Sequence, residues 1–225
     1  VVLAVIVAYQ VSATSGSPSR YIAEADIPTL APGADALAGI AEVPARMRGN
    51  DYRRDAFGES WTDDTTAPGG YNGCDTRNDI LARDLTQTTL RPGTCKVATG
   101  VLQDPYTGRR IDFTAGAQTS AAVQIDHVVA LSDAWQTGAQ QLSTADRMAL
   151  ANDPLNLLAV DGPANNGKSD GDAATWLPEQ KSFRCEYVAR QAGVKRKYDL
   201  WVTRAERAAM QRVLDTCPGQ RIPTR

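Results

Sequence analysis

Several common catalytic motifs are absent from this 225-residue chain, and it has only one histidine, His127. There is no His-Glu-x-x-His, no Gly-x-Ser-x-Gly and no Walker loop, so nothing points to a zinc protease, an α/β-hydrolase or a P-loop ATPase. No Cys-x-x-Cys pair occurs, which argues against a cysteine-based zinc site. Histidine is the side chain that titrates near neutrality without help. The single imidazole is therefore the first candidate for proton transfer.

A large excess of one charge is also lacking. The net charge is −2, from 24 Lys and Arg against 26 Asp and Glu, which argues against a strongly basic coat for nucleic acid. The distribution is uneven, because residues 181–225 hold 11 basic and 4 acidic side chains, a net charge of +7. Two interpretations have equal weight: a basic C-terminal face that meets phosphates, or a pair of solvated helices.

No apolar run is long enough to cross a bilayer, which takes about 20 residues. The short apolar run at residues 1–8 precedes a stretch rich in Ala, Pro, Gly and Ser, and it predicts the end of a signal peptide or membrane anchor. A buried strand is the alternative. We expect residues 1–49 to be this remnant with a linker, and residues 50–225 to form one domain. The mature domain is expected to be secreted or at the cell surface, without stable membrane insertion.

The four cysteines, an even number, fit an exported chain with two disulfides: Cys74, Cys95, Cys185 and Cys217. Three pairings are possible. Proximity in the sequence favours Cys74–Cys95 and Cys185–Cys217.

The hydrophobic pattern predicts two strands and a helix around the histidine. One strand spans residues 121–129, the second spans 155–160, and a helix is expected over 169–176. The other expected elements are strands over 96–102 and 110–113 and helices over 78–85, 144–152, 179–192 and 204–215. Ser143 is the expected N-cap of the second of these helices, and a capping box at Thr203 opens the last.

Polar residues occupy the ends of these central elements. Asp126 and His127 end the first strand, Asn156 opens the second, and Asn165 lies in the turn before the helix. Adjacent residues on a strand point in opposite directions, so one of the first two can hold a metal while the other addresses a water molecule. Oxygen ligands from Asp126 and Asn165 suit Mg²⁺ or Mn²⁺.

The segment 126–170 resembles the ββα-metal core of the HNH (His-Asn-His) endonucleases, in the variant whose third letter is Asn. It has Asp-His, a later Asn156, and then the run Asn-Asn-Gly-Lys-Ser-Asp at 165–170. Together with Trp61 and the segments 74–79 and 104–108, residues 50–217 resemble secreted actinobacterial HNH proteins related to the GmrSD-type nuclease domain. The resemblance implies an α+β fold. A ββα-metal core at about 121–177 would be embedded in a mainly helical domain with a few short strands.

The resemblance also implies a function, a metal-dependent endonuclease that acts on nucleic acid. DNA is the expected substrate, and the lack of a separate recognition module favours low sequence specificity. His127 is expected to be the general base, and Asp126 and Asn165 are expected to hold Mg²⁺, with Mn²⁺ as the alternative. Asn156 is expected to brace the loop that carries His127.

Several alternatives stay open. Asn166 competes with Asn165 as the ligand, and Lys168 is either a phosphate contact or an ordinary surface lysine at a helix start. Arg77 is a phosphate contact on the resemblance alone. The competing function is a disulfide-stapled secreted binding domain with an inactive HNH-like core.

Overall fold

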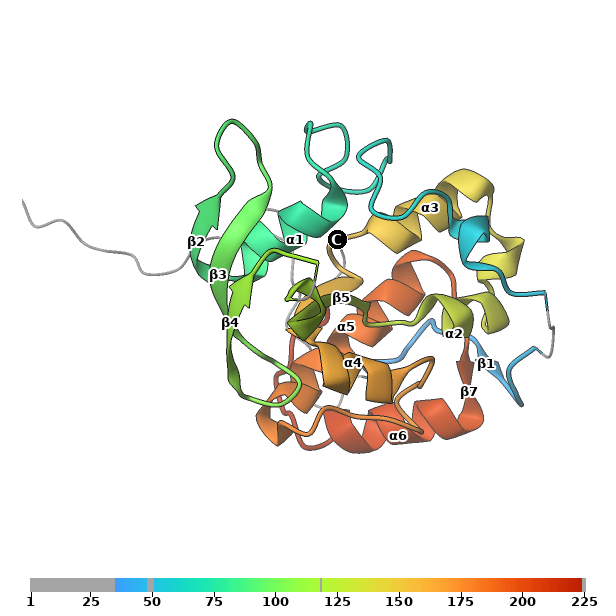
Figure 1. The fold of residues 1–225 in the computed structure, drawn as a ribbon. Coiled ribbons are helices and arrows are strands. Elements are labelled where there is room, and N and C mark those ends of the chain that lie inside the picture. Colours follow the sequence, from blue (N-terminus) through green and yellow to red (C-terminus); the bar gives the residue numbers. More distant parts are fainter. Residues whose placement is uncertain (1–34, 48–50, 118, 224–225) are drawn as a thin grey trace, which may run out of the picture.

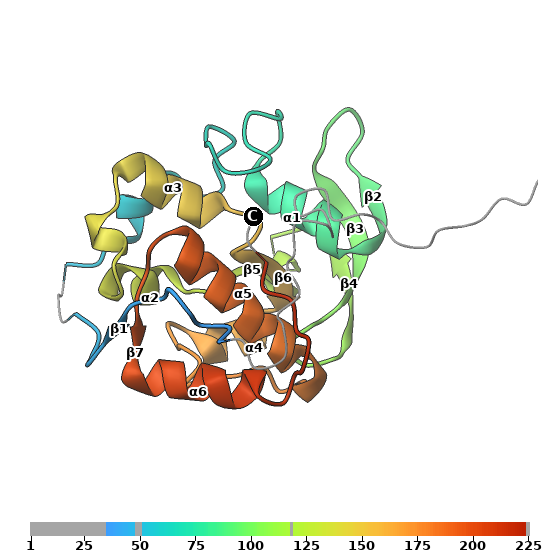
Figure 2. The same cartoon turned by 180° about the vertical axis from the view of Figure 1, so that it is seen from behind.

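Two antiparallel strands lie at the centre of the computed structural model, which describes residues 35–47, 51–117 and 119–223. These are β5 and β6, and in their register His127 lies opposite Leu157. Every residue of β6 is buried. Helix α5 lies behind the pair in Figure 1 and in front of it in Figure 2. The strand pair is therefore an internal element, and the end of β5 places Asp126 and His127 close to the core.

The described residues form six α-helices, seven strands and several short 3₁₀ turns. The helices are α1 Thr76–Asp84, α2 Leu131–Gln136, α3 Thr144–Asn152, α4 Gly162–Lys168, α5 Arg184–Lys197 and α6 Arg204–Leu214. The strands are β1 Glu42–Val43, β2 Thr86–Leu90, β3 Val97–Gln103, β4 Arg110–Thr114, β5 Val123–His127, β6 Leu157–Asp161 and β7 Val202–Thr203. This mixed composition of helices and small sheets confirms the predicted fold class at that level.

The helix after β6 starts earlier than predicted. We expected it at 169–176, but α4 begins directly after the strand because Asp161 caps it, accepting a hydrogen bond from the Ala164 N–H at 2.8 Å. A proline in its first turn is compatible with the helix start. The helix ends at Lys168, because the next residue, Ser169, has a positive φ of 51°, which is not helical. Asn165 is thus a helical residue and not part of the preceding turn.

The strands β2, β3 and β4 form an antiparallel sheet on one side of the centre (Figure 1). Helix α1 packs between this sheet and the β5–β6 pair, and it buries Ile80 and Leu81. The Cys74–Cys95 disulfide joins the chain just before α1 to the β2–β3 connection. The predicted strands at 96–102 and 110–113 are confirmed with shifts of one residue, whereas β2 was not predicted.

Helices α5 and α6 pack together on the other side, around the buried side chains of Tyr187, Val188 and Met210. The Cys185–Cys217 disulfide joins the start of α5 to the chain just after α6. The structure therefore has the cysteine pairing that proximity favours. The capping box at Thr203 is present, and Ser143 caps α3 as predicted. The predicted helix at 179–192 is shifted, because its first residues form a loop and a 3₁₀ turn.

The described part of the predicted linker belongs to the fold. Ala36, Leu37 and Ile40 are buried in the same core as α5 and α6, and β1 pairs in parallel with β7. The boundary at 49/50 otherwise stays a prediction, and the apolar run at 1–8 lies outside the described residues. In the part of the chain that the structure describes, no helix combines the length and apolar character needed to cross a membrane.

Candidate functional site

An open cleft of about 520 Å³ lies at the end of β5. Its walls come from β5, the start of α2, helix α4 and the segment around residues 52–61. The cleft brings together four of the predicted site residues: Arg77, Asp126, His127 and Asn165. Four separate regions of the sequence therefore meet at one solvent-accessible site.

His127 is held in one tautomer by the backbone. Its Nε2 lies 2.9 Å from the carbonyl oxygen of Ala151, and since a carbonyl can only accept, Nε2 carries the proton. The other ring nitrogen, Nδ1, is then an acceptor. The ring stacks on Trp61 with centroids 5.5 Å apart, and burial lowers the pKa of His127 to about 3. The imidazole is therefore neutral near pH 7, as a proton acceptor must be.

Asp126 points to the other face of β5 and is 5% exposed. The Tyr106 hydroxyl donates to Asp126 Oδ2, and the Lys168 ammonium lies 3.0 Å from Oδ1. Burial raises the pKa of Asp126, and the charge of Lys168 and the Tyr106 hydrogen bond oppose that shift. The carboxylate is thus fixed by a hydroxyl and a cation, each bound to a different oxygen.

Lys168 lies inside the protein and not at its surface. Its side chain is fully buried, and Nζ also donates to the His127 carbonyl at 2.8 Å. This ammonium therefore links α4 to the end of β5. The ammonium group already has two protein partners, the Asp126 carboxylate and the His127 carbonyl. The predicted phosphate contact by Lys168 stays a prediction.

Asn156 is fully buried and lies outside the cleft. Its Oδ1 accepts from the Val129 N–H at 2.8 Å, and its Nδ2 donates to the Val129 carbonyl at 3.3 Å and the Leu150 carbonyl at 3.4 Å. These bonds tie the loop after His127 to the start of β6. This is the position that the predicted brace requires.

Asn165 reaches the cleft from α4. Its Nδ2 donates to Gln124 Oε1 at 2.8 Å, which leaves the amide oxygen Oδ1 as an acceptor. Asn166 also lines the cleft, so it stays a competing ligand. Arg77 lies on α1, donates to the Val123 carbonyl at 3.1 Å and lines the cleft. Arg54, from the segment around residues 52–61, also lines the cleft. Burial lowers the pKa of Arg77.

Sequence reasoning gave no role to two of the residues at the site, Tyr106 and Trp61. Both were noted only as part of a family resemblance. Tyr106 is fully buried, packs against Trp176 and Tyr187, and holds Asp126. A buried tyrosine needs a partner for its hydroxyl, but the partner is 20 residues away and no local pattern identifies it.

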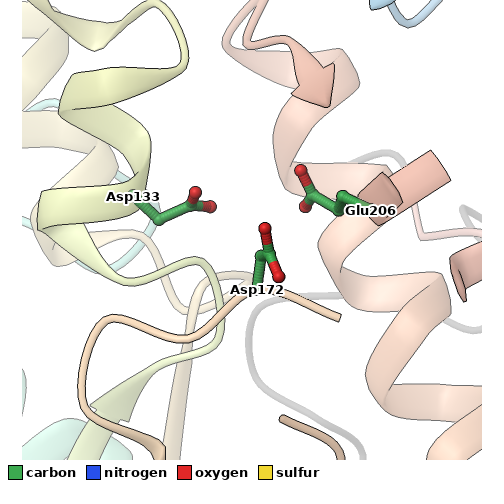
Figure 3. Close-up of side chains that lie close together, drawn as sticks. All are labelled: Asp133, Asp172 and Glu206. Carbon is green, nitrogen blue, oxygen red and sulfur yellow. The ribbon is translucent and has the colours of Figure 1, made fainter. Parts of the chain in front are cut away.

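A second group of acidic residues lies away from the cleft. Ligand atoms of Asp133, Asp172 and Glu206 lie within 4.8 Å of one another, and all three side chains are buried (Figure 3). Lys195 lies 3.2 Å from Asp133 and 2.9 Å from Glu206, and Arg46 lies 3.1 Å from both Asp133 and Asp172. We call these five residues the charged node. Each of the three carboxylates therefore already has a cation of the protein as an ion-pair partner.

Comparison with known proteins places this chain in a family. A family model described as the C-terminal domain of GmrSD restriction endonucleases matches residues 75–213. An uncharacterized secreted protein of Arthroderma benhamiae is 35% identical over 217 residues, which is 96% of this chain and 98% of the relative. No solved structure matches the chain. The matched span of the family model includes Arg77, Asp126, His127 and Asn165. The similarity therefore covers most of the cleft.

Proposed function

This chain belongs to the family of the GmrSD restriction endonuclease C-terminal domain, and from that premise we propose that it is a secreted HNH-type endonuclease. It would hydrolyse phosphodiester bonds of nucleic acid, DNA first of all, with low sequence specificity and with a divalent metal ion. The secreted relative and the two disulfides support an extracellular location.

The observation that carries the proposal is the neutral His127 at the cleft wall. Its Nε2–H is committed to the Ala151 carbonyl, so Nδ1 can take a proton from a water molecule that attacks a phosphate. Stacking on Trp61 limits rotation of the ring. General base catalysis of this kind typically contributes a factor of about 10²–10⁴ to the rate.

The residues beside His127 fit a divalent metal ion. Asp126 and Asn165 offer only oxygen ligands, and such donors suit Mg²⁺ or Mn²⁺. A carboxylate oxygen has two lone pairs, so the bonds from Tyr106 and Lys168 do not use up the ligating capacity of Asp126. When bound there, the ion would supply charge stabilisation for the phosphate and the leaving oxygen.

The remaining residues orient these groups and the substrate. Tyr106 and Lys168 fix the Asp126 carboxylate, and Asn156 braces the loop that follows His127. Arg54 and Arg77 place positive charge in the cleft, where a phosphate would be bound.

The test is cleavage of supercoiled plasmid DNA by the purified, oxidised protein. EDTA should abolish cleavage, and Mg²⁺ or Mn²⁺ should restore it. Asn165→Ala should reduce cleavage strongly, whereas the neighbouring variant Asn166→Ala is the matched control and should cleave nearly as the wild type does. Equal losses in both variants would contradict the choice of Asn165 as the ligand.

A second function has one observation in its favour. Both oxygens of Asp126 already have protein partners, as in a core that no longer takes a metal. The protein would then be a secreted binding domain with an inactive HNH-like core. A folded wild-type protein that leaves plasmid DNA intact with both Mg²⁺ and Mn²⁺ would contradict the nuclease and favour this alternative.

A further inference from the structure

A second hollow, of about 420 Å³, lies between α6, the start of α5 and the segment 173–177. Its apolar part is formed by Ala173, Leu177, Ala209 and Val213. Three cations also line it: Lys181, Arg184 and Arg212. Among the described residues that line this hollow, none is acidic. The hollow thus combines an apolar surface with positive charge that no neighbouring carboxylate in its lining offsets.

Most other cations of the C-terminal segment are neutralised within the protein. Ion pairs to Asp or Glu occupy Arg190, Lys195, Lys197, Arg204 and Arg207. Within the described chain, by contrast, Lys181, Arg184 and Arg212 form no ion pair, and Arg184 donates through Nε to the Pro178 carbonyl at 2.7 Å. Arg196 also lacks an ion pair to a carboxylate, but it donates to the carbonyls of Ala36 and Ala38, away from this hollow. The second hollow therefore gathers three cations of this segment that no carboxylate of the described chain pairs with.

The second hollow and the cleft lie on either side of one short segment. Ser169 and Asp170 line the cleft, and Ala173 lines the second hollow. Three residues of extended chain span at most about 11 Å, so the two linings approach each other closely at this segment. Along one strand of duplex DNA, phosphates follow each other about every 3.4 Å of helix axis. A polynucleotide that leaves the cleft would meet the second hollow within a few nucleotides.

We propose that the second hollow binds the phosphate backbone of the nucleic-acid substrate beyond the phosphate that is cleaved. Positive side chains on α6 and at the start of α5 would contact successive phosphates, and the apolar part would lie against sugars or bases. Such contacts carry no sequence information, which agrees with a nuclease of low sequence specificity. The inference rests on the proposed function for its substrate class, but its residues are separate from those of the cleft.

The test compares two charge-reversal variants of the full oxidised protein. Lys181→Glu/Arg212→Glu removes two cations from the second hollow. Arg91→Glu/Lys96→Glu is the matched control, because it changes the net charge equally at exposed cations of the β2–β3 connection. Affinity for a fluorescein-labelled 30-mer DNA is measured by anisotropy in EDTA over a range of salt concentrations. Cleavage of the 30-mer and of thymidine 5′-p-nitrophenyl phosphate is measured with Mg²⁺.

The hollow variant should bind the 30-mer about tenfold more weakly than the control does. Its salt slope should fall by about 2, because each of the two replaced cations would pair with one phosphate. The ratio of 30-mer cleavage to small-diester cleavage should fall in parallel. Equal affinities for the two variants would overturn the inference. Binding of inorganic phosphate alone would also overturn it. In that case phosphate would stabilise the wild type but not the hollow variant, and the two proteins would bind the 30-mer equally well.

These readouts separate the inference from the proposed function. A wild type that cleaves neither substrate, but whose 30-mer binding is weakened only by the hollow variant, would refute the nuclease and support the surface. A wild type that cleaves DNA, with both variants binding equally, would support the nuclease and refute the surface.

Discussion

Two of the places where the chain buries carboxylates, the charged node and the cleft, differ in their access to solvent. In the charged node, three carboxylates are enclosed with Lys195 and Arg46. At the cleft, one buried carboxylate, Asp126, lies beside the neutral His127 and borders an open cleft of about 520 Å³. The node has more acidic groups, but the cleft has the access that a substrate requires.

The difference shows why the number of carboxylates is a poor guide to a metal site. Burying a charge without a partner is costly, so a buried group of acids needs cations, and the protein can supply them itself. Arg46 and Lys195 do so in the node. Arg46 comes from the segment before α1 and Lys195 from α5, so the node ties distant parts of the chain together. We interpret it as a structural element.

The largest expected effect is on catalysis at the cleft. His127→Ala should reduce DNA cleavage by a factor of about 10²–10⁴, because the group that accepts the proton of the attacking water is lost. Cleavage rate is measured on plasmid DNA, and circular dichroism checks that the variant is folded. A folded His127→Ala protein that cleaves at the wild-type rate would show that His127 is not the general base.

The next effect is on stability and concerns the node. Lys195→Met should lower the free energy of unfolding by about 3–5 kcal/mol, since it leaves Asp133 and Glu206 without their shared cation. Urea denaturation measures it. Arg110→Met is the control, because its ion pair with Asp112 is exposed and such pairs contribute little. Equal small losses in both variants would show that the node does not hold the fold.

One disulfide lies near the cleft and the other near the charged node. Cys74–Cys95 ties down the start of α1, which carries Arg77 of the cleft. Cys185–Cys217 joins the start of α5 to the chain after α6, and these helices carry Lys195 and Glu206 of the node. The chain-entropy model gives each bond roughly 3 kcal/mol. Cys185→Ser/Cys217→Ser should therefore lower the melting temperature clearly, and it should also weaken DNA binding at the second hollow, whose lining includes Cys185. Unchanged melting on scanning calorimetry would contradict this.

A smaller effect is a pH dependence of stability that comes from the node. Burial, opposed by Lys195 and reinforced by Asp133, raises the pKa of Glu206 from its ordinary value of 4.5 to about 7. Three carboxylates face two cations there, so one proton balances the charge. The folded state binds this proton more tightly than the unfolded chain does, so the contribution is complete below pH 4.5 and is lost as the pH rises to about 7.

Glu206→Gln tests this dependence, because glutamine keeps the shape of the capping residue but cannot ionise. Between about pH 4.5 and 7, the wild type should lose up to a few kcal/mol of stability relative to Glu206→Gln. Urea midpoints at several pH values provide the measurement. Parallel curves for the two proteins would mean that Glu206 does not take up the proton.

Local patterns in the sequence predicted those parts of the fold that depend on local chemistry. The Thr203 capping box, the Ser143 cap and the strands around the Asp104–Gly108 turn were all found from short spacings. The helix of the central unit was misplaced, because Asp161, which follows the predicted strand at 155–160, was not considered as a helix cap. The short strands β1 and β7 pair although they lie far apart in the sequence, and strands of two residues are too short to give a pattern.

The site was predictable only in part for a similar physical reason. Adjacent Asp126 and His127, with Asn156 and Asn165 at later junctions, could be picked out from their positions in the sequence. Their partners could not, since Tyr106, Lys168 and the Ala151 carbonyl become neighbours only when the chain folds. The charged node shows the same limit, because its residues are spread along the sequence from the segment before α1 to α6.

The most direct test of the account is where the protein binds a metal ion. Mn²⁺ binding is measured by isothermal titration calorimetry on the oxidised wild type, on Asp126→Asn/Asn165→Ala and on Asp172→Asn. We predict one site in the wild type, at least tenfold weaker binding in the cleft variant, and wild-type binding in Asp172→Asn. Loss of the ion in Asp172→Asn, with undiminished binding in the cleft variant, would place the metal in the node and contradict the account.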